Sequence, residues 1–155
     1  MIEVPSDRTD EVFPLQKTLG YTFSDIRLLN KALTHKSYVN ERSEFLKHNE
    51  RFEFLGDSVL DVLVSDYLVS EFSEYAEGTL SKIRAAVVNE TCLADLARKI
   101  ELGKYLLLGK GEDLSGGRNK SSILADTFEA VAGALFSDGG LESASQVFLP
   151  LLKDE

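Results

Sequence analysis

Acidic side chains recur at helical spacing between residues 49 and 72. Glu50, Glu53 and Asp57 fall within about 60° of arc if each residue turns the chain by about 100°. Asp126 and Glu129 are three residues apart in a second segment, so they would be neighbours on another helix surface. Carboxylates that converge cannot all stay ionised unless a cation lies among them. If the two helices cross at these points, the sequence predicts a site for a divalent cation.

Carboxylate oxygens without His or Cys favour Mg²⁺ or Mn²⁺ over zinc. Mg²⁺ keeps several waters and pairs with substrate phosphates, so the chemistry that such a site suggests is phosphoryl transfer. A di-iron helical bundle is the rival metal site, and it needs Glu-x-x-His pairs. Neither His35 nor His48 follows a glutamate at that spacing, so we interpret both as structural or surface residues.

An acidic stripe on an amphipathic helix, taken alone, is more often a solvated face than a metal site. Two features argue against a solvated face here. Gly56 lies inside the helix at a cost of about 1 kcal/mol relative to Ala, which close approach by another element would explain. Phe54 projects on or near the acidic side, where a purely solvated face would not carry it. Asp61 falls on the same stripe, and geometry alone does not exclude it as a ligand.

The elements that must position these residues are all expected to be helices, because strand-like alternation is short and Gly and Pro are sparse in the periodic segments. We predict helices over 10–19, 24–37, 49–72, 79–100, 120–137 and 141–152, with a break at Gly139–Gly140. Segments 38–48 and 111–119 are predicted as loops, and 101–110 could hold a short helix. The predicted core face of the long helix holds Phe52, Leu55, Val59, Val62 and Leu63. One all-α domain over 1–155 is the simplest account.

The net charge of −9 argues against general polyanion binding. The charge is uneven, because residues 78–120 carry eight basic against five acidic side chains, between two acidic blocks. We expect this basic segment to face a phosphate backbone, with Arg118 and Lys120 as candidate contacts. Lys82 and Arg84 are weaker candidates, for which a solvated helix face is an equally good explanation.

Targeting signals are missing from the sequence as it stands. Residues 1–7 lack the cationic and apolar regions of a signal peptide. No apolar run approaches the ~20 residues that span a bilayer. The single cysteine, Cys92, excludes a disulfide within the chain and a multi-cysteine zinc site. We therefore expect a cytoplasmic location and no membrane partner.

The run Asn49-Glu50-Arg51-Phe52-Glu53-Phe54-Leu55-Gly56-Asp57-Ser58-Val59-Leu60 closely resembles the signature of the ribonuclease III family, with Phe52 where the family usually has Leu. The run Ser122-Ile123-Leu124-Ala125-Asp126-Thr127-Phe128-Glu129-Ala130 resembles its second catalytic segment. Further landmarks are Leu33-Thr34-His35-Lys36-Ser37, Glu77-Gly78-Thr79-Leu80-Ser81 and Gly116-Gly117-Arg118. The combination covers nearly the whole chain and is far more specific than any single motif.

The resemblance implies the helical endonuclease-domain fold of that family and a role for each matching residue. The residues that it assigns to Mg²⁺ binding, with Mn²⁺ as a substitute, are Glu53, Asp57, Asp126 and Glu129, with Asp57 and Glu129 as the catalytic residues. It assigns Glu50 and Glu77 as supporting acids near that cluster. Phe54 corresponds to an aromatic that plugs into the partner subunit, whereas Asp61 has no catalytic counterpart and is expected to be structural.

The activity implied by the resemblance is hydrolysis of double-stranded RNA by a homodimer, in rRNA and mRNA processing. Mg²⁺-activated water would cut one strand per subunit, leaving a 5′-phosphate, a 3′-hydroxyl and a short 3′ overhang. We expect residues 1–155 to form the endonuclease domain, with the family's double-stranded RNA-binding domain absent from this chain. Two alternatives stay open. A non-catalytic relic of the fold would bind RNA or protein, and a structural helical domain would bind no Mg²⁺.

Overall fold

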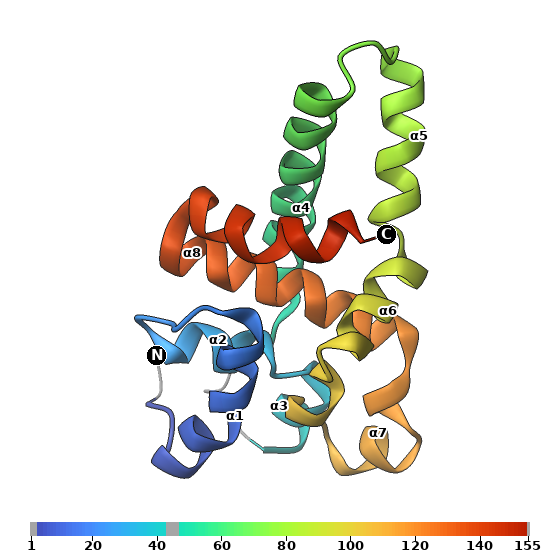
Figure 1. Cartoon of the computed structure of the whole chain (residues 1–155). Coiled ribbons are helices and arrows are strands. Elements are labelled where there is room, and N and C mark those ends of the chain that lie inside the picture. Colours follow the sequence, from blue (N-terminus) through green and yellow to red (C-terminus); the bar gives the residue numbers. More distant parts are fainter. Residues whose placement is uncertain (1–2, 43–46, 155) are drawn as a thin grey trace.

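The chain folds into helices joined by short links in a computed structural model that describes residues 3–42 and 47–154 (Figure 1). The helices are α1 (Ser6–Leu19), α2 (Ile26–Ala32), α3 (Lys36–Arg42), α4 (Glu50–Glu71), α5 (Glu77–Val87), α6 (Glu90–Lys99), α7 (Lys110–Leu114) and α8 (Ser121–Lys153), with 3-10 turns at Leu102–Tyr105 and Gly117–Asn119. Within the described ranges, extended pairing is limited to an isolated bridge between Thr34 and Leu107. The predicted all-α class is confirmed.

The single helix predicted over 79–100 is wrong, because α5 ends at Val87 and α6 begins at Glu90. Asn89 separates them in an extended conformation, and its side chain accepts a hydrogen bond of 2.9 Å from the backbone N–H of Cys92. Asn is a favoured residue at this position because its side-chain oxygen satisfies a free N–H of the first helical turn. The hydrophobic period continues through the break, which is why it predicted one helix.

Four other boundaries also differ from the prediction. The helix predicted over 24–37 ends at Ala32, and α3 begins at Lys36. The predicted loop over 38–48 begins inside α3, while its part at 43–46 lies outside the described residues. Residues Lys110–Leu114 form α7 at the start of the second predicted loop, and α1 begins at Ser6, about one turn before Asp10. Short helices of this kind depend on tertiary packing rather than on their own propensity.

The break predicted at the double glycine is confirmed at Gly140, where a φ of 84° interrupts α8. The segment after Gly140 turns back across the first half of α8 (Figure 1). Asp138 fixes this turn by accepting hydrogen bonds from the Tyr21 hydroxyl at 2.7 Å and from the N–H groups of Ser24 at 2.8 Å and Asp25 at 2.9 Å. Neither α8 nor any other helix in the described ranges is long and apolar enough to cross a membrane.

The centre of the fold is the crossing of α4 and α8, where the two backbones touch. A Cβ added to Gly56 would overlap the carbonyl oxygen of Glu129, and one added to Gly133 would overlap the carbonyl oxygen of Phe52. Two facing glycines therefore allow an approach that any side chain would prevent. This contact explains the glycine inside α4, and it brings the acidic residues of both helices together.

The apolar face of α4 packs largely as predicted. Phe52, Val59 and Leu63 are buried, and Leu55 is partly buried. Val62 is 49% exposed, so its assignment to the core is wrong. Beyond the crossing, α4 runs beside α5 (Figure 1), and the end of α8 also reaches it, where Nζ of Lys153 lies 4.7 Å from the ring centre of Tyr67.

Candidate metal centre

Four carboxylates converge where α4 crosses α8. Glu53, Asp126 and Glu129 offer oxygen atoms that all lie within 4.8 Å of one another. Asp57 lies beside Glu129, and all four line one hollow of about 520 Å³. Asp126 and Glu129 lie just before Gly133 on α8. The contact of Gly133 with α4 therefore sets their distance from the acidic pair of α4. The fold thus brings together two acidic pairs that are about 70 residues apart in the sequence.

Glu53, Asp126 and Glu129 are partly buried, Asp57 is exposed, and the carboxylates repel one another. Burial, followed by the hydrogen bond and charge of Asp57, raises the pKa of Glu129 to about 8. Burial, followed by the charges of Asp126 and Glu50, raises the pKa of Glu53 to about 7. Burial is also the largest cause of the raised pKa of Asp126. Near neutral pH the cluster therefore retains protons, and a divalent cation would displace them.

The donor set fits a hard divalent cation. Glu53, Asp126 and Glu129 supply only oxygen, and in the described part of the chain no histidine or cysteine joins them. Oxygen donors of this kind suit Mg²⁺ and Mn²⁺. The hollow beside them leaves space for the waters that Mg²⁺ retains and for oxygens of a substrate.

The two supporting acids that were expected near the cluster occupy different places. Glu50 lines the hollow, and its carboxylate lies 3.7 Å from Nζ of Lys36. Glu77 begins α5, beyond the far end of α4 (Figure 1), and accepts a hydrogen bond of 3.1 Å from the Ser81 hydroxyl. About 20 Å of helix lies between Asp57 and the end of α4. Within one subunit, the expectation that Glu77 lies near the cluster is therefore wrong.

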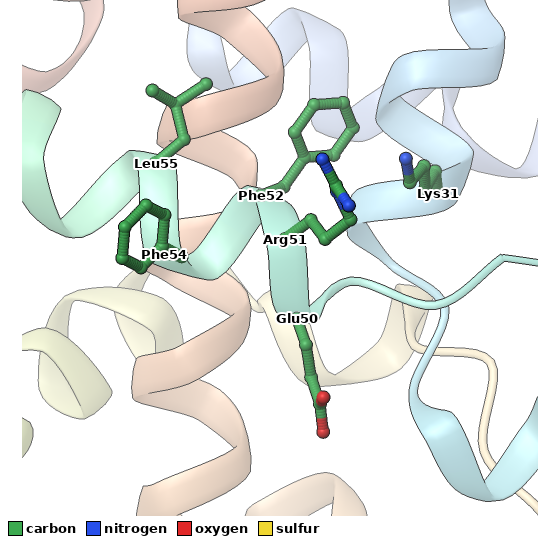
Figure 2. Close-up of a pocket in the computed structure, with 6 residues that line it drawn as sticks. All are labelled: Lys31, Glu50, Arg51, Phe52, Phe54 and Leu55. Atoms are coloured by element: carbon green, nitrogen blue, oxygen red, sulfur yellow. The ribbon is translucent and has the colours of Figure 1, made fainter.

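Phe54 lies next to the acidic residues, and 79% of its surface is exposed. Phe52, two positions earlier, points the other way and is buried, with Nζ of Lys31 4.7 Å from its ring centre. A second hollow of about 560 Å³ adjoins both rings (Figure 2); its lining residues are Lys31, Glu50, Arg51, Phe52, Phe54 and Leu55. Phe54 thus presents an exposed aromatic ring at the rim of a hollow.

Arg118, expected to contact RNA, has several hydrogen-bond partners within the fold. Its Nη1 donates to the carbonyl oxygens of Gly103 at 3.0 Å and Leu106 at 2.7 Å. Its Nε and Nη2 donate to the Asp113 carboxylate at 3.0 and 3.2 Å. These bonds occupy four of the five N–H donors of the guanidinium group. Arg118 therefore ties the link between α6 and α7 to the start of α8, and its contact with RNA stays a prediction.

The other candidate cations have contacts of their own. Lys120 Nζ lies 2.6 Å from a carboxylate oxygen of Glu112, and its side chain remains 45% exposed. On α5, Arg84 donates a hydrogen bond of 2.8 Å to the Ser65 hydroxyl, while Lys82 is exposed. Of the four, only Lys120 lines a hollow that also holds acidic residues of the metal centre.

That hollow, of about 270 Å³, contains residues that sequence reasoning did not assign to the site. It shares Glu50, Glu53 and Asp126 with the metal centre. Its other polar lining residues are His35, Lys36, Asn49, Glu112, Lys120, Ser122 and Thr127. These come from the α2–α3 link, α3, α7 and the starts of α4 and α8. Helical periodicity could not find them, because it relates only residues of the same helix.

Comparison with known proteins gives a consistent result. A family model described as Ribonuclease-III-like matches residues 25–154. Ribonuclease 3 of Oleidesulfovibrio alaskensis is 53% identical over 135 residues, which cover 87% of this chain and 59% of that protein. Ribonuclease 3 of Desulfotalea psychrophila is 52% identical over 141 residues, covering 88% of this chain and 58% of that protein. The chain thus spans less than two thirds of the length of these curated relatives.

Solved structures match the fold as well. The nuclease domain of ribonuclease III from Campylobacter jejuni superposes with a TM-score of 0.86 at 43% identity, covering 92% of this chain and 96% of that one. Its description names a region involved in dimer formation. A Dicer from Pichia stipitis has a TM-score of 0.59 at 28% identity, covering 84% of this chain and 57% of that one.

Proposed function

Because the chain belongs to the ribonuclease III family, we propose that it is an endonuclease domain that hydrolyses double-stranded RNA in the cytoplasm. The observation that carries the proposal is the convergence of four carboxylates at the α4–α8 crossing. A solvated acidic stripe would not need a second acidic pair from another helix beside it. The raised pKa values of Glu53 and Glu129 also support a site whose charge is completed by a cation.

The residues proposed to hold Mg²⁺, with Mn²⁺ as a substitute, are Glu53, Asp57, Asp126 and Glu129. When bound, the cation would polarise the scissile phosphate and activate water. Asp57 and Glu129 lie side by side, and we assign them as the catalytic pair. Glu50 is the supporting acid at the edge of the site, where Lys36 partly neutralises it. The expected products carry a 5′-phosphate, a 3′-hydroxyl and a short 3′ overhang.

A homodimer is the proposed active form, because one carboxylate cluster per subunit would cut one strand of the duplex. The exposed Phe54 ring and the hollow beside it support this proposal, since each subunit of a symmetric dimer offers the same surface twice. The relative from C. jejuni has a region involved in dimer formation. Arg118 and Lys120 are the proposed RNA contacts of the basic segment.

The test is cleavage of a long RNA duplex with Mg²⁺ at low salt, comparing wild type with Glu129→Gln. Glu142→Gln is the matched control, because Glu142 is an exposed glutamate on the same helix. We expect wild type and Glu142→Gln to cut the duplex into short fragments with 5′-phosphates. Glu129→Gln should lose more than about 100-fold in rate, since even residues that only support metal ligands are worth 10–100-fold.

The same assay separates the alternatives. If wild type binds the duplex but does not cut it with Mg²⁺ or Mn²⁺, the chain is a non-catalytic RNA-binding member of the fold. If it neither binds the duplex nor takes up Mg²⁺, the acidic cluster is only structural and the proposal is wrong.

A further inference from the structure

The small hollow beside the metal centre places two lysines next to the carboxylate cluster. Lys36 Nζ lies 3.7 Å from a Glu50 oxygen, and Lys120 Nζ lies 2.6 Å from a Glu112 oxygen. The two side chains are 60% and 45% exposed, so both ammonium groups can reach an incoming molecule. They line the same hollow of about 270 Å³ as Asp126.

The backbone around Lys36 is held by hydrogen bonds from two directions. The N–H of His35 donates to the carbonyl oxygen of Leu107 at 3.0 Å. The Ser37 hydroxyl accepts from the N–H of Gly109 at 2.9 Å and bonds Nδ1 of His35 at 2.7 Å. A Cβ at Gly109 would come within 2.6 Å of the carbonyl oxygen of Ser37, so the two segments touch. Lys36 therefore projects from a fixed frame rather than from a loose loop.

Once the metal centre is filled, the charges in this hollow balance, so its acidic residues would no longer repel a phosphate. Each lysine neutralises one glutamate, Lys36 with Glu50 and Lys120 with Glu112. Glu53 and Asp126 would be neutralised by a divalent cation at the proposed site. A lysine ammonium group has three donors, so each lysine can contact a phosphate oxygen and keep its glutamate.

We propose that Lys36, together with Lys120 from another element, holds the RNA backbone phosphate that adjoins the scissile one. This inference rests on the proposed nuclease function, because the phosphate is that of the same RNA strand. Lys36 would then be a positioning residue. It would fix the strand beside the cation, since contacts that orient a substrate lower the barrier of the following reaction.

The first test compares Lys36→Ala and Lys36→Arg with wild type in single-turnover cleavage of a short RNA duplex. Lys104→Ala is the matched control, because Lys104 also pairs with a glutamate, at 3.5 Å, and its side chain is 56% exposed, away from the hollow. We expect Lys36→Ala to cut about tenfold more slowly, the usual effect of a lost hydrogen bond to a charged group. Lys36→Arg should restore most of the rate, and Lys104→Ala should match wild type.

The second test asks whether the partner of Lys36 is one particular phosphate. A series of duplexes carries one neutral methylphosphonate each, at a different position around the cleaved bond. Cleavage of every duplex is measured with wild type and with Lys36→Ala. At one adjoining position, the neutral group should slow wild type about tenfold and leave Lys36→Ala unchanged. Duplex binding is also measured at several salt concentrations in a Glu129→Gln background. The slope of log affinity against log salt concentration should become shallower by about one in the Lys36→Ala variant, which corresponds to one lost phosphate contact.

The outcomes are distinguishable. If wild type does not cut, the proposed function fails. If wild type cuts and Lys36→Ala cuts equally well, only the role of Lys36 is wrong. The inference is also overturned if the methylphosphonate effects are the same in both proteins at every position. It is overturned too if excess Mg²⁺ restores the rate of Lys36→Ala, since Lys36 would then act through Glu50 on the metal.

Discussion

Glu53 and Glu129 titrate far above the ordinary glutamate pKa of 4.5, at about 7 and about 8. Burial is the largest cause for both, and the neighbouring carboxylates add to it. In the unfolded chain these glutamates lose their protons near pH 4.5. In the folded, metal-free protein they keep them to higher pH. Their contribution to stability is therefore fully present below pH 4.5 and is lost as pH rises through 7 to 8.

This linkage gives a prediction at the residue scale. Without metal, the urea midpoint of wild type should decrease as pH is raised from about 5 to about 8.5. The midpoint of Glu129→Gln should decrease less, because its amide does not ionise. Mg²⁺ should raise the urea midpoint of wild type more at the higher pH, since binding then displaces fewer protons. Urea unfolding followed by circular dichroism measures both effects. Identical pH slopes for the two proteins would contradict the assignment of Glu129 as a proton-holding group.

At the scale of elements, the crossing of α4 and α8 determines whether a site exists at all. Gly56 and Gly133 bring the two backbones into contact, and the acidic residues lie within about a turn of that contact. Replacing either glycine would push the helices apart and separate Glu53 and Asp57 from the α8 pair. The same contact thus supports both the stability of the core and the geometry of the metal centre.

We predict that Gly56→Ala destabilises the protein by about 3 kcal/mol, even though alanine favours a helix by about 1 kcal/mol. The added methyl group would overlap the backbone of Glu129, which cannot rotate away. Gly78→Ala in α5 is the control, because a Cβ there meets nothing within 4 Å, and it should be neutral or slightly stabilising. The free energy of unfolding in urea measures both. Equal stability of Gly56→Ala and wild type would contradict the direct backbone contact.

At the scale of the whole molecule, one side of α4 lacks a partner among the described residues. Phe54, Val62 and Val69 on this helix are 79%, 49% and 63% exposed. The neighbouring helix, α5, buries none of its residues fully. Exposed apolar side chains concentrated on one element are typical of an association surface, in agreement with the proposed dimer.

We predict that Phe54→Ala weakens the dimer. Burying a phenylalanine contributes about 1.5–3 kcal/mol, and a symmetric dimer contains the contact twice. The dimer dissociation constant should therefore rise by about 100-fold or more. Leu114→Ala is the control, since Leu114 is 89% exposed on α7. Sedimentation equilibrium measures the association. A Phe54→Ala variant that dimerises as tightly as wild type would show that the ring lies outside the interface.

Much of the fold and the main acidic residues followed from the sequence. The helical period located α4 and the two acidic pairs, because a helix fixes the neighbours of each residue within one turn, and the double glycine located the break at Gly140. The glycine inside α4 indicated a close approach before its partner was known, and Gly133 proved to be that partner. Local signals of this kind depend only on residues near one another in the chain.

The tertiary structure decided which residues from separate segments share a site. It removed Glu77 from the cluster of its own subunit, because α4 carries the chain away from the crossing before α5 begins. It also brought the carbonyl oxygen of Leu106 and the carboxylate of Asp113 to the guanidinium group of Arg118. Lys36 came beside Glu50 because Asn49, at the start of α4, donates a hydrogen bond to the carbonyl oxygen of Thr34 in the α2–α3 link. Such contacts arise from packing between elements, and no spacing within one element encodes them.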